Sequence, residues 1–287
     1  MYFNKKKMNV LGKIKRKIYN LSHPELGVVL MLHRVVDSRS RIAANRELEI
    51  TADFLEQTIL EYRQKGYAFV NLDEVADIIE KGNTKHKFVC FTFDDGYRDN
   101  YEIAYPIFKK YNIPFTIYVT TDFYEQKALL WWYALEDLCV TDEEFLTYRE
   151  KIFNLKTDQI ESAFREWFPG RNYSFADMVN KMSLTVAQIK ELSDSGLCYI
   201  GSHTVTHPRL DKLTPEEQRY EISTSKNKLE AVVGKQVEHF AFPYGCYNSD
   251  TIPIVAECGY KTAVRAYGGI VRKGAELLQI NRVFLKQ

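Results

Sequence analysis

Two adjacent carboxylates, Asp94 and Asp95, follow the apolar residues 88–91. A strand that is apolar on both faces is typical of the interior of a parallel sheet, and α/β folds expose catalytic groups at the carboxyl ends of such strands. Further along the chain, His203 and His207 follow a second apolar segment, and their spacing lets both rings point the same way on a helical turn. One aspartate and two histidines can bind a divalent ion, zinc above all with cobalt and nickel also suited, and leave room for a water.

The elements that must position these residues alternate between apolar runs and amphipathic segments. Strands are predicted at residues 28–32, 88–93, 115–119, 198–200, 240–242, 261–264 and 280–285. Helices are predicted between them at residues 52–65, 73–81, 99–111, 186–193, 215–233 and 250–258. This alternation predicts an α/β fold with a parallel sheet or barrel, and 287 residues are enough for one such domain.

Between residues 121 and 182 the alternation lapses into polar and aromatic helix-like sequence, which predicts an insertion after a strand. On a barrel, an insertion at that point lies over the face where substrate enters. Trp131 and Trp132 leave two interpretations open: they stack on the ring face of a sugar, or they form the core of a small helical unit. Both tryptophans are therefore candidate substrate-binding residues.

Charge and hydropathy exclude some classes of function. The formal net charge of +1 gives no general case for nucleic-acid binding. The first twenty residues are basic and contain no acid, so residues 1–26 are predicted to be a leader that is either a solvated tail or an amphipathic helix on anionic lipid. No apolar stretch reaches the roughly 20 residues that span a bilayer, and no signal-type region follows the leader. We expect a cytoplasmic protein, with peripheral membrane contact through the leader as the alternative.

The five cysteines, Cys90, Cys139, Cys198, Cys246 and Cys258, are odd in number and show no C-x-x-C spacing. This pattern argues against a disulfide framework and against a cysteine zinc site. We expect most of the cysteines to be buried packing residues.

The residues with candidate chemistry also carry a family resemblance. Residues 92–96 (TFDDG) and 203–207 (HTVTH) resemble the first two motifs of the polysaccharide deacetylases, carbohydrate esterase family 4, and residues 240–245 (FAFPYG) resemble the third. The resemblance extends from about residue 28 to the C-terminus and leaves out the leader and the 121–182 insertion. It implies a distorted (β/α) barrel of about seven units over residues 27–287, and a metal-dependent hydrolase that removes acyl groups from amino sugars.

Carried over by position, the resemblance implies that Asp95, His203 and His207 hold the ion and that Asp94 is the general base. A carboxylate that ligates the metal is committed to it, so its neighbour is the one free to take a proton from water. The resemblance also implies that a backbone N–H near Tyr244 completes an oxyanion site.

The third motif departs from the family pattern. It often begins with an arginine that orients the base, but this chain has Ala241 there. Arg265 and Arg282, near later strand ends, are the candidates to replace it. Arg282 and Pro243 are also predicted to contact substrate.

The last motif departs as well, because no histidine follows His239, whereas many members of the family place a histidine acid there. His33, at the end of the first predicted strand, resembles the arrangement in biofilm-polysaccharide deacetylases and is the candidate acid. Its alternative role is to cap the strand. We expect His23, His86 and His239 to have surface or packing roles.

Together these observations predict a metal-dependent N-deacetylase whose substrate is an N-acetylated amino sugar in a glycan, a lipid-linked intermediate or a nucleotide-linked precursor. The missing export signal favours a precursor. The alternatives are a deformylase or another amide hydrolase on the same fold, or an inactive protein that only binds carbohydrate. The sequence leaves the sugar, the metal and the oligomeric state open.

Overall fold

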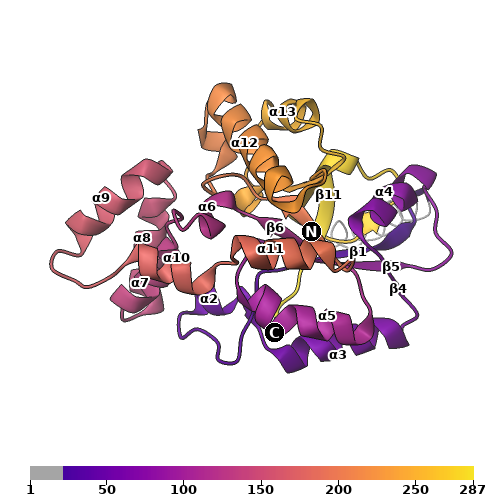
Figure 1. Cartoon of the computed structure of the whole chain (residues 1–287), viewed down its shortest axis with the longest axis horizontal. Coiled ribbons are helices and arrows are strands. Elements are labelled where there is room, and N and C mark those ends of the chain that lie inside the picture. The colour runs from indigo at the N-terminus through magenta and orange to yellow at the C-terminus, as the bar shows by residue number, and fades with distance from the viewer. Residues whose placement is uncertain (1–21) are drawn as a thin grey trace, which may run out of the picture.

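Seven apolar segments form the parallel strands of a closed barrel, which confirms the predicted fold class (Figure 1). The computed structural model describes residues 22–287. The barrel strands are β1 (Glu25–Leu32), β5 (Phe88–Phe93), β6 (Phe115–Val119), β7 (Cys198–Ser202), β8 (His239–Ala241), β9 (Thr262–Gly268) and β11 (Ile280–Phe284). Each pairs in parallel with the next in that order, and β11 pairs with β1 to close the ring.

The strands explain why the sequence reads as continuous apolar runs. Every residue of β5 is buried, because one face points into the barrel and the other packs against the surrounding helices. Gly27 allows β1 and β5 to approach closely, since a Cβ at this position would lie 2.4 Å from the Phe88 ring. Both faces of β5 are therefore used for packing. Reactive side chains can be presented only after its carboxyl end, where Asp94 and Asp95 lie.

Four short strands add to the predicted set. β4 (Ala68–Phe69) extends the sheet beside β5, and β10 (Val271–Arg272) pairs antiparallel with β1. β2 (Arg34–Val35) and β3 (Glu49–Ile50) form a separate pair. Two residues are too few to produce a recognisable hydrophobic alternation, so the sequence did not reveal them.

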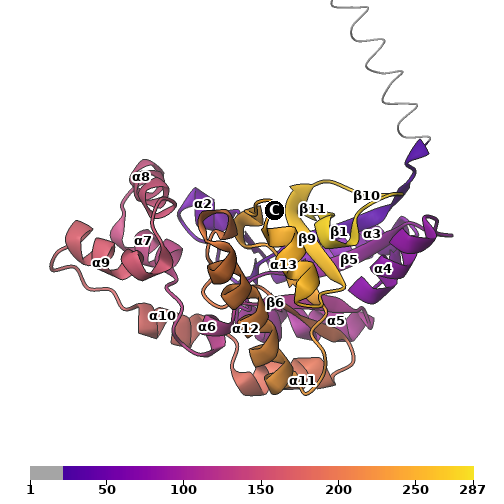
Figure 2. The same ribbon diagram turned by 90° about the horizontal axis from the view of Figure 1, so that it is seen from above.

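Helices cover the outside of the barrel close to the predicted positions (Figure 2). They are α3 (Ala52–Gln64), α4 (Leu72–Lys81), α5 (Tyr105–Tyr111), α11 (Val186–Asp194), α12 (Pro215–Val233) and α13 (Thr251–Glu257). Thr51 caps α3 by accepting a hydrogen bond from the Phe54 N–H. The predicted helix 99–111 differs in its first part, where Asn100–Ala104 form a π-helix before α5 begins. Single π turns of this kind often lie beside functional sites.

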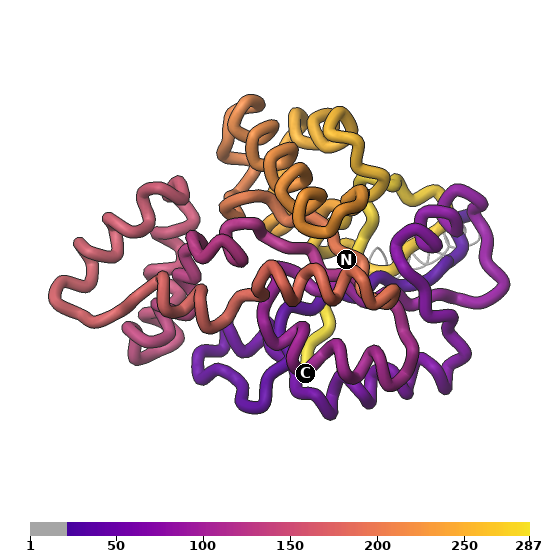
Figure 3. Tube along the Cα trace, in the orientation of Figure 1, coloured from indigo at the N-terminus to yellow at the C-terminus, as the bar shows by residue number. Residues whose placement is uncertain are grey.

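The inserted segment forms a helical unit on one side of the barrel (Figure 1, left). It comprises α6 (Thr121–Tyr124), α7 (Trp131–Leu138), α8 (Asp142–Ile152), α9 (Thr157–Trp167) and α10 (Phe175–Met182). The chain leaves the barrel after β6 and returns to it ahead of α11 (Figure 3). The unit has a hydrophobic cluster of its own, in which Phe164 is fully buried, and the short helix α2 (Ala43–Arg46) lies beside it.

Several further predictions can be compared with the structure. Residues 1–21 of the predicted leader lie outside the described residues, and β1 begins at Glu25, before the predicted boundary at residue 27. The cysteines are free, as predicted. His239 is buried beside the Thr262 hydroxyl, and His86 is exposed. Among residues 22–287, no helix combines the length and apolar character that crossing a membrane requires.

Candidate active site

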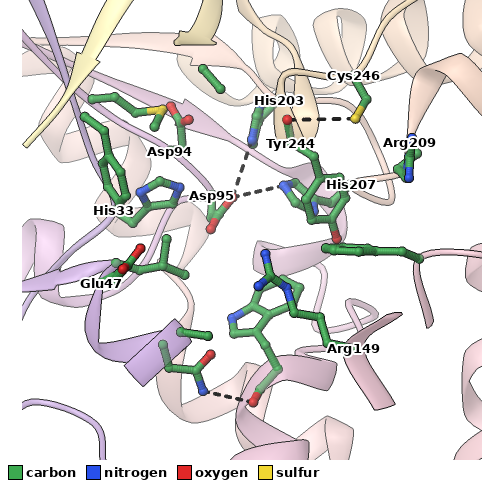
Figure 4. A pocket seen from close by; sticks show the side chains of 18 of the residues that line it. His33, Glu47, Asp94, Asp95, Arg149, His203, His207, Arg209, Tyr244 and Cys246 are labelled. Carbon is green, nitrogen blue, oxygen red and sulfur yellow. Dashed lines mark hydrogen bonds and ion pairs between the residues drawn. The ribbon is translucent and has the colours of Figure 1, made fainter. Parts of the chain in front are cut away.

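The predicted chemical groups meet at one end of the barrel, because parallel strands bring their carboxyl ends to the same edge (Figure 4). Asp94 and Asp95 follow β5, His33 follows β1 and the histidine pair follows β7. They line a cavity of about 340 Å³ between the barrel mouth and the inserted helices. This volume lies within the usual range for small-molecule sites.

Asp95, His203 and His207 form the densest group of ligand atoms in this cavity. Asp95 Oδ1 lies 3.4 Å from His203 Nε2 and 3.3 Å from His207 Nε2, and one donor atom from each residue falls within 4.8 Å of the others. Asp95 Oδ1 is buried and has no hydrogen-bond partner in the described chain. The His203 ring donates through Nδ1 to the Ala241 carbonyl at 2.9 Å, which leaves the Nε2 lone pair facing Asp95. These donors fit a divalent ion.

Burial and the neighbouring charges shift the pKa values of Asp95, His203 and His207 in opposite directions. Burial opposes the charge on Asp95, but His207 and His203 outweigh it and lower the pKa of the carboxyl. Burial lowers the pKa of His207 to about 4. For His203, burial is outweighed by the nearby Asp95 and Asp94, and the pKa is raised.

The loop that carries the two histidines is not the helical turn that their spacing suggested. Thr204 and His207 both have left-handed backbone conformations, with φ of 68° and 58°. Glu221 of α12 holds the loop, because its carboxylate accepts hydrogen bonds from the N–H groups of Val205 and Thr206 and from the Thr206 hydroxyl. Left-handed backbone in non-glycine residues is strained, so this anchoring from α12 is what brings both rings onto Asp95.

Asp94 is held by Arg282 of β11. The two guanidinium NH groups each donate to one carboxylate oxygen at 2.7 Å, and the arginine side chain is fully buried. Burial opposes the charge on Asp94, but Arg282 outweighs it and lowers the pKa of the carboxyl. The side chain of Arg282 pairs with Asp94 and does not line the cavity, so its position does not support the predicted contact with substrate. Of the two arginines considered, Arg265 contributes only its carbonyl, which accepts from Arg282 Nε.

His33 lies beside the aspartate pair and is half-buried. Its ring packs edge-on against Phe284 at 5.8 Å, and its Nδ1 has no hydrogen-bond partner among the described residues. The Asn100 side chain, from the π-helix, donates to the His33 carbonyl at 2.8 Å and fixes the backbone. Burial lowers the pKa of His33 against the pull of Asp95 and Asp94. The side chain faces the cavity.

The third motif places Tyr244 against His207, one of the three candidate metal ligands. Tyr244 has φ of 57°, inside the short 3₁₀ turn Pro243–Gly245, and its ring centroid lies 4.5 Å from that of His207. Burial raises the pKa of the Tyr244 hydroxyl. Pro243 is buried and does not line the cavity, so its predicted contact with substrate is not supported by its position.

The two tryptophans are core residues that also border the cavity. Trp131 and Trp132 are both buried and pack edge-to-face at 5.1 Å. Trp132 donates through Nε1 to the Tyr97 hydroxyl at 3.0 Å, and its ring lies 5.8 Å from His207. Their packing within the inserted unit limits the area that each can offer to a sugar.

Three lining residues carried no signal in the sequence. Arg149 lies on α8, Arg209 follows the histidine loop and Tyr267 is near the end of β9. Tyr267 is 65% exposed, more than any other aromatic side chain of this lining. Each stands outside any recognisable motif, and only the fold brings it to the cavity.

The structure is a closed parallel barrel with a carboxylate pair and two histidines at its mouth. The sequence profile of the polysaccharide deacetylase family matches residues 81–263. The chain belongs to this family.

Known proteins with similar sequences agree with this classification. A putative polysaccharide deacetylase of Bacillus subtilis, YxkH, is 24% identical over 256 residues, which are 89% of this chain and 70% of that protein. The poly-β-1,6-N-acetyl-D-glucosamine N-deacetylase of Staphylococcus aureus is 24% identical over 67% of this chain. The match spans only 52% of that longer protein.

Solved structures have the same fold. The Streptococcus pyogenes deacetylase PplD, in complex with acetate, superimposes with a TM-score of 0.64 at 26% identity, covering 91% of this chain and 92% of that one. IcaB from Ammonifex degensii also gives a TM-score of 0.64, with 24% identity and the same coverage of both chains. At this level of identity, the likeness to IcaB concerns the fold.

Proposed function

We propose that this protein is a metal-dependent hydrolase that removes the N-acetyl group from an amino sugar in a glycan or glycan precursor. The observation that carries the proposal is the group of Asp95, His203 and His207 next to a separate carboxylate, Asp94, that Arg282 holds. Family membership and the N-deacetylase relative support the choice of substrate.

Asp95, His203 and His207 would hold the ion, which we expect to be zinc, with cobalt or nickel as alternatives. A bound divalent ion supplies Lewis acidity, which polarises an amide carbonyl and makes water more acidic. The remaining chemistry belongs to side chains and backbone groups of this chain.

Asp94 takes the proton of the attacking water. Its two hydrogen bonds from Arg282 leave further lone pairs on both carboxylate oxygens, so the group can still accept a proton. The same arginine favours the ionised form, which is the form that a base requires. The Tyr244 N–H, presented by a left-handed turn, donates to the oxygen that becomes negative as the acetyl carbon is attacked.

His33 donates a proton to the departing sugar amine. An amine anion is a poor leaving group, so cleavage of the amide requires a proton at this nitrogen. His33 lines the cavity beside Asp94 and Asp95 without ligating or pairing with either, which leaves its ring free for this role.

Acetate release tests the proposal. Purified protein is incubated with a panel of N-acetylated and N-formylated amino sugars, with and without a chelator, and metal content is measured by elemental analysis. We expect acetate from at least one N-acetyl sugar, loss of this activity with chelator, and recovery when zinc is returned. Release of formate alone would indicate a deformylase. Sugar binding without hydrolysis, in metal-loaded protein, would indicate an inactive carbohydrate-binding protein.

A further inference from the structure

The cavity beside the metal-ligand group contains a basic side chain, Arg149 of α8, with no ion-pair partner among residues 22–287. The other charged groups of the lining are paired: Asp94 with Arg282, Glu47 with Lys286, Arg209 with Asp211, and Asp95 with the two histidines. The guanidinium of Arg149 points into the cavity, toward the side of Asp95 and His207 (Figure 4). Its positive charge is therefore available to a ligand.

Aromatic packing holds Arg149 in place and leaves its hydrogen-bond donors free. The guanidinium carbon lies 5.0 Å from the ring centroid of Phe153. Phe153 is itself held edge-to-face by Trp131 at 5.8 Å and by Tyr244 at 5.5 Å. A guanidinium has five N–H donors, and within residues 22–287 no side-chain hydrogen bond from Arg149 occupies them. Stacking orients the group, and the outer edge that remains suits an oxyanion.

The position of Arg149 relative to the metal-ligand group indicates which part of a substrate it would meet. His207 contacts Tyr244 at 4.5 Å, Tyr244 contacts Phe153 at 5.5 Å, and Phe153 lies under Arg149. Arg149 is therefore two aromatic rings from the ligand atoms along the cavity wall. When the acetamido group of a substrate lies at Asp95 and His207, a ring substituent or a neighbouring sugar can occupy the part of the cavity that Arg149 lines.

We propose that Arg149 is a specificity-determining residue that binds an anionic group, a phosphodiester or a carboxylate, carried by the amino-sugar substrate or by the sugar next to it. This inference rests on the proposed function and narrows its substrate class. A planar guanidinium can donate two parallel hydrogen bonds to either oxyanion. A neutral glycan in the same place offers only hydroxyl acceptors, which bind a guanidinium more weakly than an oxyanion does.

A matched set of substrates tests this inference. Three disaccharides share an N-acetylglucosamine and differ in the neighbouring sugar, which is neutral, a uronic acid or a sugar with a glycerol phosphodiester. Acetate release gives kcat and KM for each, and calorimetric titration gives Kd. In the wild type we expect kcat/KM for at least one anionic disaccharide to exceed that for the neutral one by about tenfold or more. Comparing the two anionic substrates shows which oxyanion the site selects.

Arg149→Gln should remove this preference, mainly through KM, and Arg149→Lys should restore part of it. Lys151→Gln is the control, because Lys151 lies on the same helix and packs outward against Tyr148 and Trp167. It removes the same charge outside the cavity, so the preference should stay as in the wild type. Melting temperatures verify that all variants are folded.

The outcomes separate this inference from the proposed function. If the wild type releases acetate equally well from neutral and anionic disaccharides, or if Arg149→Gln changes all substrates alike, the anion site is wrong while the deacetylase stands. If Arg149→Gln changes only inhibition by free acetate, the arginine binds product and the inference is also wrong. If neither these disaccharides nor any sugar of the wider N-acetyl panel releases acetate, the proposed function fails. In that case the Kd values test the anion site by themselves. Equal Kd values of wild type and Arg149→Gln for the anionic sugars would show that Arg149 does not bind the anionic group.

Discussion

The barrel mouth and the inserted helices build two walls of the same cavity in different ways. On the barrel side, directional contacts fix each polar group: Arg282 holds Asp94 through two hydrogen bonds, and the Ala241 carbonyl holds the His203 ring. On the insertion side, Arg149 is held by ring packing on Phe153. Hydrogen bonds fix angle and protonation state, which chemistry requires, whereas aromatic packing fixes position and leaves donors free for a ligand.

A buried ion network joins the two regions. The Arg34 guanidinium lies between the rings of Tyr97, 5.2 Å away, and Tyr133 of the insertion, 5.0 Å away. Arg34 also pairs with Asp99 at 2.7 Å and with Glu49 at 3.3 Å. Because Arg34 directly follows His33, this network ties the insertion to the segment that carries the candidate acid. The two walls of the cavity are thus built differently, but the contacts of Arg34 connect them.

The largest effect on activity is expected from removing a candidate metal ligand on the barrel side of the cavity. His207→Ala should lose the bound ion and essentially all turnover, because two donors remain where three converge. Metal content by elemental analysis and acetate release check this result. His86→Ala is the control, since His86 is exposed and has no part in the site. Full metal content in His207→Ala and in His203→Ala alike would refute the ligand set.

Asp94→Asn should keep the metal and lower turnover by roughly 10²–10⁴-fold. The amide has the shape of the carboxylate but cannot take the proton of water. Activity and metal content are measured on the same sample. Loss of the metal together with turnover would mean that Asp94 is a ligand and that the two aspartates exchange roles.

His33→Ala should keep the metal and lose most amide hydrolysis, by roughly 10²–10⁴-fold, because the amine then leaves without its proton. An activated aryl acetate separates the roles, since its phenolate leaves unprotonated. The variant should retain far more activity on that ester than on the N-acetyl sugar. Equal losses on both substrates, with metal and fold intact, would remove His33 as the acid.

Arg282→Lys should move the acid limb of kcat/KM to higher pH by roughly one unit. In the wild type, Arg282 lowers the pKa of Asp94, so the base stays ionised as the pH falls. Lysine keeps the charge but not the two-pronged contact, so the pKa rises toward its ordinary value and Asp94 becomes protonated at a higher pH. A pH profile of kcat/KM with metal-saturated enzyme measures the shift. An unchanged acid limb would mean that another group sets it.

The smallest effect on chemistry is expected from the core of the insertion. Phe164→Leu and Phe108→Leu both truncate fully buried rings, but Phe164 lies in the cluster of the insertion and Phe108 packs against Phe93 under the barrel mouth. Each should lower the free energy of unfolding by about 1–3 kcal/mol. Only Phe108→Leu should also lower kcat, because it loosens the strand that carries the aspartate pair. Equal losses of kcat would show that the two regions are mechanically coupled.

Much of the barrel could be predicted from the sequence, because a strand that is buried on both faces appears as a short, mostly apolar run. The runs 88–93 and 115–119 are apolar except for one threonine in each, and they form β5 and β6 over those residues. Asp95 and the two histidines were recognisable because they follow such runs. Two-residue strands and the π turn at Asn100 left no comparable pattern.

The amino-acid sequence by itself determined which residues have the chemistry and which strand ends carry them, since residue type and hydrophobic periodicity are local properties. Only the tertiary structure decided that Arg282, far along the chain, pairs with Asp94, and that Glu221 anchors the histidine loop. It also placed Arg149 in the cavity. The physical reason is that barrel closure and helix packing create contacts between distant segments. Local hydrophobic periodicity does not specify which distant side chains form an ion pair, or which charged side chain stays without one.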